Sequence, residues 1–161
     1  MPTAEFVYVT YIRSTRERVW QALTDNAFIA QYWSNHHNVS DWEVGSPWTH
    51  QDASDPSIVD IAGTVLERDH PRRLVYTFAS PRDIGNDDKT SRVAFDIAQS
   101  GELVRLTVTH DRLEEGSSMH KGISGGWPQI LASLKSLLET GSALPQISTR
   151  GVGKWVSVEF T

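Results

Sequence analysis

Three consecutive segments in the middle of the chain alternate apolar and polar residues with a period of two. In each segment the apolar side chains share one face: Leu74, Tyr76 and Phe78; Val93, Phe95 and Ile97; Val104, Leu106 and Val108. A period of two is typical of strands, and one apolar face per strand indicates an antiparallel sheet that is covered on one side only. The chain must therefore supply an element that buries this face.

The covering element is predicted at residues 123–139, the longest helical pattern in the sequence. Its apolar residues recur at helical spacing: Trp127, Ile130, Leu131, Leu134, Leu137 and Leu138. Gly141 follows as a stop signal, and Pro128 suits the first turn of a helix, where no N–H is needed. We expect this helix to lie across the concave face of the sheet.

The remaining elements complete an α+β fold. A strand over 5–13 is followed by two short helices over 15–24 and 27–33, the first capped by Ser14 or Thr15. Turn signals then separate six β-like runs at 39–44, 48–51, 58–68, 74–79, 91–97 and 103–110. The pattern predicts one domain over 1–141, with a curved antiparallel sheet of about seven strands wrapped around the C-terminal helix. Residues 142–161 are predicted to be an extension, with an extra strand or arm at 155–160.

Composition excludes several classes of protein. The net charge of −5 argues against a nucleic-acid binder, which would carry a basic patch. The chain has no cysteine, so disulfides and thiolate metal sites are excluded. No apolar run approaches the ~18–20 residues of a membrane span, and no signal-peptide pattern begins the sequence. We expect a cytoplasmic protein with no membrane span.

Five stretches of this sequence resemble a known family. They are TRERVWQALTD (15–25), Trp33, GTVLERDHPRRL (63–74), LTVTH (106–110) and GGWPQILASLK (125–135). In this order and spacing, over residues 4–140, the chain is similar to the activator-of-heat-shock-protein-90-ATPase-like (AHSA-like) family. That family belongs to the START/SRPBCC superfamily, the Bet v 1-like helix-grip proteins.

The resemblance implies a seven-stranded sheet that grips the long helix and leaves a cavity between them. Members of the superfamily use this cavity for lipids, sterols, polyketides and other apolar molecules, and some are cyclases or other enzymes. The family name also implies a chaperone partner. The separate N-terminal domain of the eukaryotic chaperone activators has no counterpart in this sequence, so we expect that partner less than a small hydrophobic one.

No catalytic motif accompanies the fold, and whether the chain is an enzyme stays open. His110 follows Leu106 and Val108 on one strand face and is expected to point into the concave side. There it can act as an acid or base with Tyr76 or an adjacent carboxylate, in a cyclase, hydrolase or dehydratase. The simpler interpretation, which we favour, is a structural histidine bonded to a backbone carbonyl.

Metal and cofactor sites are not predicted. His36, His37, His50 and Asp52 supply ligand atoms, but their spacing matches no metal-binding motif, and the histidines are expected in solvated loops. The carboxylates of Glu43, Asp52, Asp60, Glu67 and Asp96 are expected on the solvent side of the sheet.

Large aromatic residues give the strongest indication of function. We expect an aromatic or lipid-like ligand in a cavity lined by Trp33, Trp48, His50, Tyr76, Phe78, Phe95, Val108, His110, Trp127 and Leu131. Any single one of them is more often a core residue than a cavity residue, Trp127 above all. A homodimer through residues 155–160 is a further expectation, because an exposed strand invites pairing.

Overall fold

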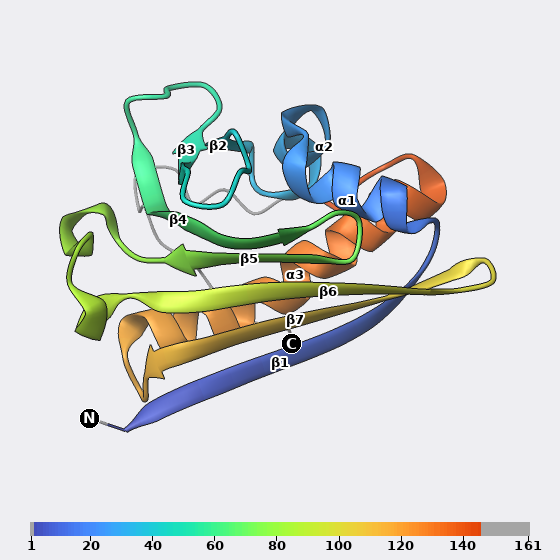
Figure 1. Cartoon of the computed structure of the whole chain (residues 1–161). Coiled ribbons are helices and arrows are strands. Elements are labelled where there is room, and N and C mark those ends of the chain that lie inside the picture. Colours follow the sequence, from blue (N-terminus) through green and yellow to red (C-terminus); the bar gives the residue numbers. More distant parts are fainter. Residues whose placement is uncertain (1, 146–161) are drawn as a thin grey trace, which may run out of the picture.

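The computed structural model describes residues 2–145, and these form one antiparallel sheet of seven strands with a long helix across it (Figure 1). The strands are β1 (Thr3–Arg13), β2 (His36–Ser40), β3 (Pro47–Asp52), β4 (Val59–Asp69), β5 (Arg73–Phe78), β6 (Ser91–Ser100) and β7 (Leu103–Glu114). The helices are α1 (Arg16–Thr24), α2 (Asn26–Tyr32) and α3 (Ser118–Thr140), and two single 3₁₀ turns, η1 (Pro81–Asp83) and η2 (Asp87–Lys89), lie between β5 and β6. The strand order β1-β7-β6-β5-β4-β3-β2 confirms the predicted helix-grip fold.

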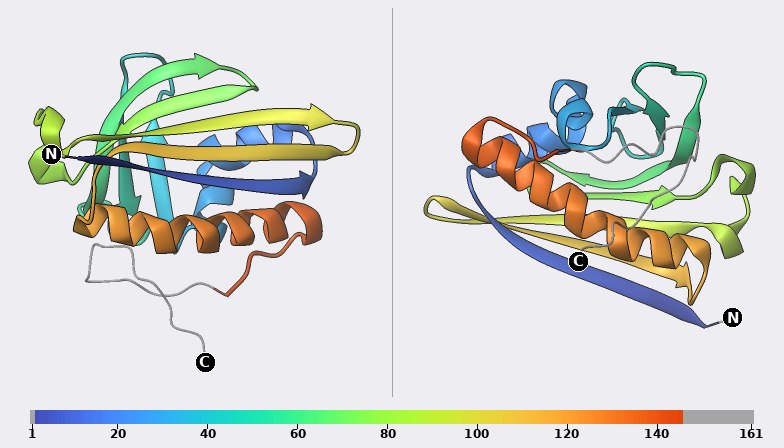
Figure 2. Two further views of the ribbon diagram at one scale, coloured as in Figure 1. Left: turned by 90° about the horizontal axis from the view of Figure 1, so that it is seen from below. Right: turned by 180° about the vertical axis from the view of Figure 1, so that it is seen from behind.

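The helix α3 runs along the concave side of the sheet, beside β1 and β7 (Figure 2). Its inner face carries the apolar residues that the helical spacing predicted, and they are buried against the inward residues of the strands. Two side chains of α3 also reach the free edge of β1: Glu139 accepts the Arg13 N–H at 2.8 Å, and Lys135 bonds the Tyr11 carbonyl. The helix therefore covers both the core face and one edge of the sheet.

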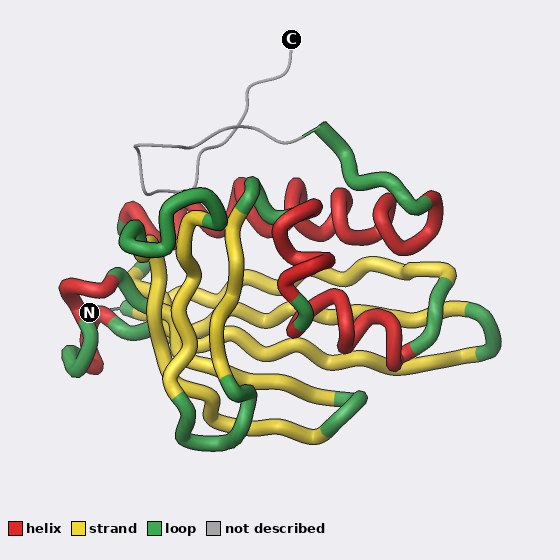
Figure 3. The backbone as a smooth tube through the Cα atoms, turned by 90° about the horizontal axis from the view of Figure 1, so that it is seen from above, coloured by secondary structure: helices red, strands yellow, loops and turns green. Residues whose placement is uncertain are grey.

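The helices α1 and α2 pack against one another on the same side of the sheet as α3, with α2 next to β2 and α1 in contact with β6 (Figure 3). Thr15 caps α1 through the Arg18 N–H, and Asp25 caps α2 through the Ala27 N–H. The hydroxyl of Tyr32 donates to the Ala22 carbonyl at 2.8 Å and joins the two helices.

Several predicted boundaries are wrong. The helix α3 begins at Ser118, not at 123, because Ser117 caps it by accepting the His120 N–H at 3.1 Å. Pro128 therefore lies inside the helix rather than in its first turn. The strand predicted at 39–44 lies at His36–Ser40, and the last strand runs on to Glu114, beyond His110. The strand predicted at 155–160 falls outside the described residues.

No helix within residues 2–145 is long and apolar enough to span a membrane.

Candidate functional site

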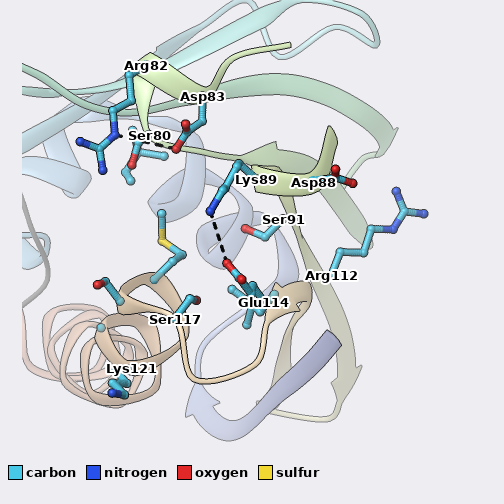
Figure 4. A pocket seen from close by; sticks show the side chains of 15 residues that line it. Ser80, Arg82, Asp83, Asp88, Lys89, Ser91, Arg112, Glu114, Ser117 and Lys121 are labelled. Carbon is cyan, nitrogen blue, oxygen red and sulfur yellow. Dashed lines mark hydrogen bonds and ion pairs between the residues drawn. The ribbon is translucent and has the colours of Figure 1, made fainter. Parts of the chain in front are cut away.

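A groove of about 620 Å³ opens at the end of the sheet where β5 passes through η1 and η2 into β6, and where β7 passes into α3. It lies between these connections and the first turns of α3 (Figure 4). Its walls combine apolar and charged side chains, namely Ile61, Ser80, Arg82, Asp83, Asp88, Lys89, Ser91, Arg112, Leu113, Glu114, Ser117, Ser118, Met119, Lys121 and Gly122.

The rim of the groove is charged. Lys89 of η2 and Glu114 of β7 point toward one another, with Nζ and Oε2 3.5 Å apart, while Arg112 points outward (Figure 4). Ile61 and Leu113 supply buried apolar surface among the lining residues. A groove with an apolar part and a charged rim suits a molecule that is itself partly apolar and partly polar.

Ser91, also a lining residue, begins a chain of hydrogen bonds into the core. Its hydroxyl lies 2.8 Å from the Phe78 carbonyl and 2.7 Å from Nε2 of His110, and the indole N–H of Trp127 donates to Nδ1 of His110 at 3.0 Å. An indole is a donor only, so Nδ1 must be unprotonated and the neutral ring carries its proton on Nε2. His110 then donates to Ser91, and Ser91 donates to the Phe78 carbonyl.

This arrangement fixes His110 as a neutral structural residue. The ring is fully buried, and burial lowers its pKa from 6.5 to about 3. Both ring nitrogens have protein partners, so neither is available to exchange a proton with a substrate. The favoured structural role of His110 agrees with this geometry. The expected partner is wrong, since the ring bonds Ser91 and Trp127 and not a backbone carbonyl.

The ten residues predicted to line a cavity are all buried. Their rings contact one another across the sheet: ring centroids lie 4.3 Å apart for Trp48 and Tyr76, 5.5 Å for Tyr76 and Phe95, and 5.8 Å for Phe95 and Trp127. Trp33 reaches the same centre, 5.3 Å from Trp127. None of the ten is among the residues that line the groove. Their role as ligand contacts therefore stays a prediction.

The polar residues of β2, β3 and β4 are not where the alternation predicted them. His36 belongs to a strand and is buried, and its Nε2 lies 2.7 Å from a carboxylate oxygen of Asp60. Asp52 is buried as well, with Oδ1 accepting the backbone N–H groups of Ser54 and Asp55. Asp60 of β4 is thus half-buried against His36, and Asp52 is bonded to the turn that follows β3, so neither acid is a free carboxylate on the solvent side of the sheet. Among the described residues, no group of three or more His, Asp or Glu side chains is arranged to hold a metal ion.

The sequence patterns did not predict the residues that line the groove, although the position of one of them, Ser91, could have been predicted. Ser91 precedes Val93 and Phe95 at the same period of two, so its side chain had to share their inward face. The lining residues of η1, η2 and the first turn of α3 lie in polar stretches without periodicity, and only the tertiary fold brings them together.

The sequence matches the model of one protein family. The model of the family described as "Activator of Hsp90 ATPase homolog 1-like protein" matches residues 13–139. No curated protein matched the chain.

Three solved structures show the same fold. The Aha1 dimer from Colwellia psychrerythraea is 18% identical, with a TM-score of 0.71 over 86% of this chain and 98% of that one. CalU16 from Micromonospora echinospora is 20% identical, with a TM-score of 0.68 over 88% of this chain and 77% of that one. PFC0360w, an HSP90 activator from Plasmodium falciparum, is 18% identical, with a TM-score of 0.69 over 83% and 95%.

Proposed function

Because the chain belongs to the activator of Hsp90 ATPase homolog 1-like family, with a sheet that curves around α3, we propose that it binds a small hydrophobic molecule between sheet and helix. The observation that supports this proposal is the groove, because it opens between the end of β7 and the first turns of α3. A volume of about 620 Å³ lies within the range of small-molecule sites. The ligand is aromatic or lipid-like, and its polar end lies at the charged rim.

A binding screen tests the proposal. We expect a flat aromatic compound or a fatty acid to raise the melting temperature of the protein, and a ligand at 100 times its Kd stabilises by ~2.7 kcal/mol. Native mass spectrometry of the purified protein gives an independent test through co-purified ligand. If neither method finds a bound compound, the proposal fails.

A pair of variants locates the site. Ser118 is exposed and lines the groove, so Ser118→Trp is expected to fill part of it and to weaken binding of the hit compound. Ser57→Trp places the same ring at an exposed position outside the groove and is expected to leave the affinity unchanged. Equal effects of the two changes would show that the compound binds elsewhere.

The enzymatic alternative finds little support in the geometry. It relied on His110 as acid or base, and both ring nitrogens of that residue are occupied by Ser91 and Trp127. The alternative that the family description favours is activation of a chaperone ATPase. Adding the protein to a purified Hsp90 and measuring ATP hydrolysis tests it, and an unchanged rate excludes it.

A further inference from the structure

Apart from Trp48, the inner face of the β2–β3 hairpin is polar, whereas the other strands present mostly apolar side chains to the core. His36 and Asn38 of β2 and His50 and Asp52 of β3 are all buried there. In the antiparallel register His36 pairs with Asp52, and Asn38 pairs with His50. Buried polar groups are normally satisfied within the fold, so each one should have identifiable partners.

One half of this group is satisfied. Nδ1 of His36 lies 2.8 Å from the Ser34 carbonyl, which can only accept, and Nε2 lies 2.7 Å from Asp60. Asp52 bonds the backbone of the turn that follows it. The polar side-chain atoms of His36 and Asp52 therefore have partners within the fold, and their hydrogen bonds stabilise the hairpin.

The other half is not satisfied. Nδ1 of His50 lies 2.6 Å from Oδ1 of Asn38, but the amide nitrogen of Asn38 has no hydrogen-bond partner, although the residue is only 1% exposed. Nε2 of His50 has no hydrogen-bond partner within residues 2–145 either, but it is not one of the fully buried atoms that lack a partner. Leaving a buried polar atom without a partner costs about 1–3 kcal/mol, so this pair is poorly explained by a role in folding alone.

The two atoms have complementary chemistry. With Oδ1 of Asn38 accepting from Nδ1–H of His50, the free amide nitrogen is a donor and the free Nε2 is an acceptor. Rotating the amide by 180° exchanges the roles of the two residues, and the pair still offers one donor and one acceptor. Burial, and after it the charge of His36 stacked 4.3 Å away, lowers the pKa of His50 well below 6.5, so the pair is uncharged.

The pair is also one strand away from a residue of the groove, although neither Asn38 nor His50 lines the groove itself. His50 is in register with Ile61 of β4, and Ile61 lines the groove. On its other side the His50 ring contacts Trp33, with centroids 4.7 Å apart, and Trp33 contacts Trp127 of α3. Ile61 is therefore the lining residue that connects the groove to this pair, one strand away from it.

We infer that Asn38 and His50 form a subsite for the buried polar group of the ligand, and that this group is neutral and both donates and accepts, as an alcohol, a primary amide or a protonated carboxylic acid does. The inference rests on the proposed function. A charged group is disfavoured, because neither Asn38 nor His50 carries a charge that would compensate it in a buried position.

Matched probes test the subsite. The compounds are 2-naphthol and naphthalene, which share one ring system and differ in a single hydroxyl. Calorimetric titration of the wild-type protein is expected to give at least a ~10-fold lower Kd for 2-naphthol, because its hydroxyl satisfies the free atoms. In the double variant Asn38→Leu/His50→Phe this preference is expected to disappear while naphthalene still binds.

Two controls separate a subsite from a structural role. Thr49→Val changes the polar residue that precedes His50 in β3, whose side chain lies on the opposite face of the strand, and is expected to keep the preference. The double variant removes both hydrogen-bonding partners together, so its free energy of unfolding is expected to stay equal to that of the wild type or to rise. A large loss of stability in this variant would overturn the inference in favour of a structural pair.

The remaining outcomes also decide the matter. If the wild type binds both probes equally, the subsite is absent and only an ordered water satisfies the pair, while the proposed function stands. If neither probe nor any compound of the screen binds, the proposed function fails and the subsite fails with it.

Discussion

The indole N–H of Trp127 donates a hydrogen bond of 3.0 Å to Nδ1 of His110, and this single contact joins the middle of α3 to the inner face of β7. It also determines the proton on the imidazole, since Nδ1 must accept. The helix that covers the sheet is thus attached to it by a directional bond as well as by apolar packing.

Replacing Trp127 by Phe is expected to destabilise the protein by more than the lost apolar area explains. The change leaves Nδ1 of His110 as a buried acceptor without its donor, at a cost of about 1–3 kcal/mol. Trp20→Phe is the matched control, because Trp20 is buried while its indole N–H makes no hydrogen bond to the described residues. Urea unfolding of both variants measures the difference, and equal losses would contradict the role assigned to the bond.

The stability of the protein should depend on pH through His110. Its pKa is about 3 in the folded state and near 6.5 when unfolded, so between these values the unfolded chain binds more protons. The free energy of unfolding therefore falls as the pH is lowered from 6.5 toward 3, by up to about 1.4 kcal/mol per pH unit. The buried His50, whose pKa is also lowered, adds a slope of the same sign.

Urea unfolding between pH 4.5 and 6.5 measures this slope, and His110→Gln is expected to reduce it. Val108→Ala, at a neighbouring inward position of β7, destabilises the core without removing a titrating group and should keep the wild-type slope. A slope in His110→Gln equal to that of the wild type would show that His110 is not held neutral in the folded state.

The fold could be predicted because its strongest signals are local. The alternation in β5, β6 and β7 and the apolar stripe of α3 are each set by burial against the same interior, and the structure places them as expected. The β2–β3 hairpin could not be predicted in this way. Its inward positions hold His36 and Asn38, so the polar residues lie where the alternation rule expects apolar ones.

The groove was not predictable from periodicity, since its walls come from η1, η2 and the first turn of α3, which meet only in the folded chain. The start of α3 was missed for a related reason. Residues 118–122 carry little apolar periodicity, and the hydrogen bond that the Ser117 side chain accepts from the His120 N–H decides where the helix begins.

That hydrogen bond yields a prediction. Ser117→Ala removes the cap and is expected to cost about 1 kcal/mol of the free energy of unfolding. Ser118→Ala changes the adjacent exposed serine, whose hydroxyl makes no bond within residues 2–145, and is expected to cost less than ~0.5 kcal/mol. Thermal unfolding of the two variants compares them. If Ser117→Ala leaves the stability unchanged, the helix begins further along the chain, as the apolar pattern alone suggests.

Gly63 is expected to be the most sensitive glycine of the sheet. A Cβ at this position would lie 1.9 Å from the Thr77 carbonyl oxygen and 2.6 Å from Nε1 of Trp48. These two atoms form a hydrogen bond of 2.7 Å with each other, which attaches the Trp48 ring to β5. Gly63→Ala must therefore displace both a strand and a buried indole, at an expected cost of about 3 kcal/mol or more.

Gly85→Ala is the matched comparison for this change. Gly85 has a φ of +87° and open space around it. An alanine there is therefore expected to lower the stability only through its left-handed backbone conformation, by about 1–2 kcal/mol. Chemical denaturation of the two variants gives the difference, and the indole ¹H–¹⁵N NMR signal of Trp48 is expected to shift in Gly63→Ala alone. If both variants lose the same stability and that signal stays in place, β4 and β5 are not as close at Gly63 as the structure has them.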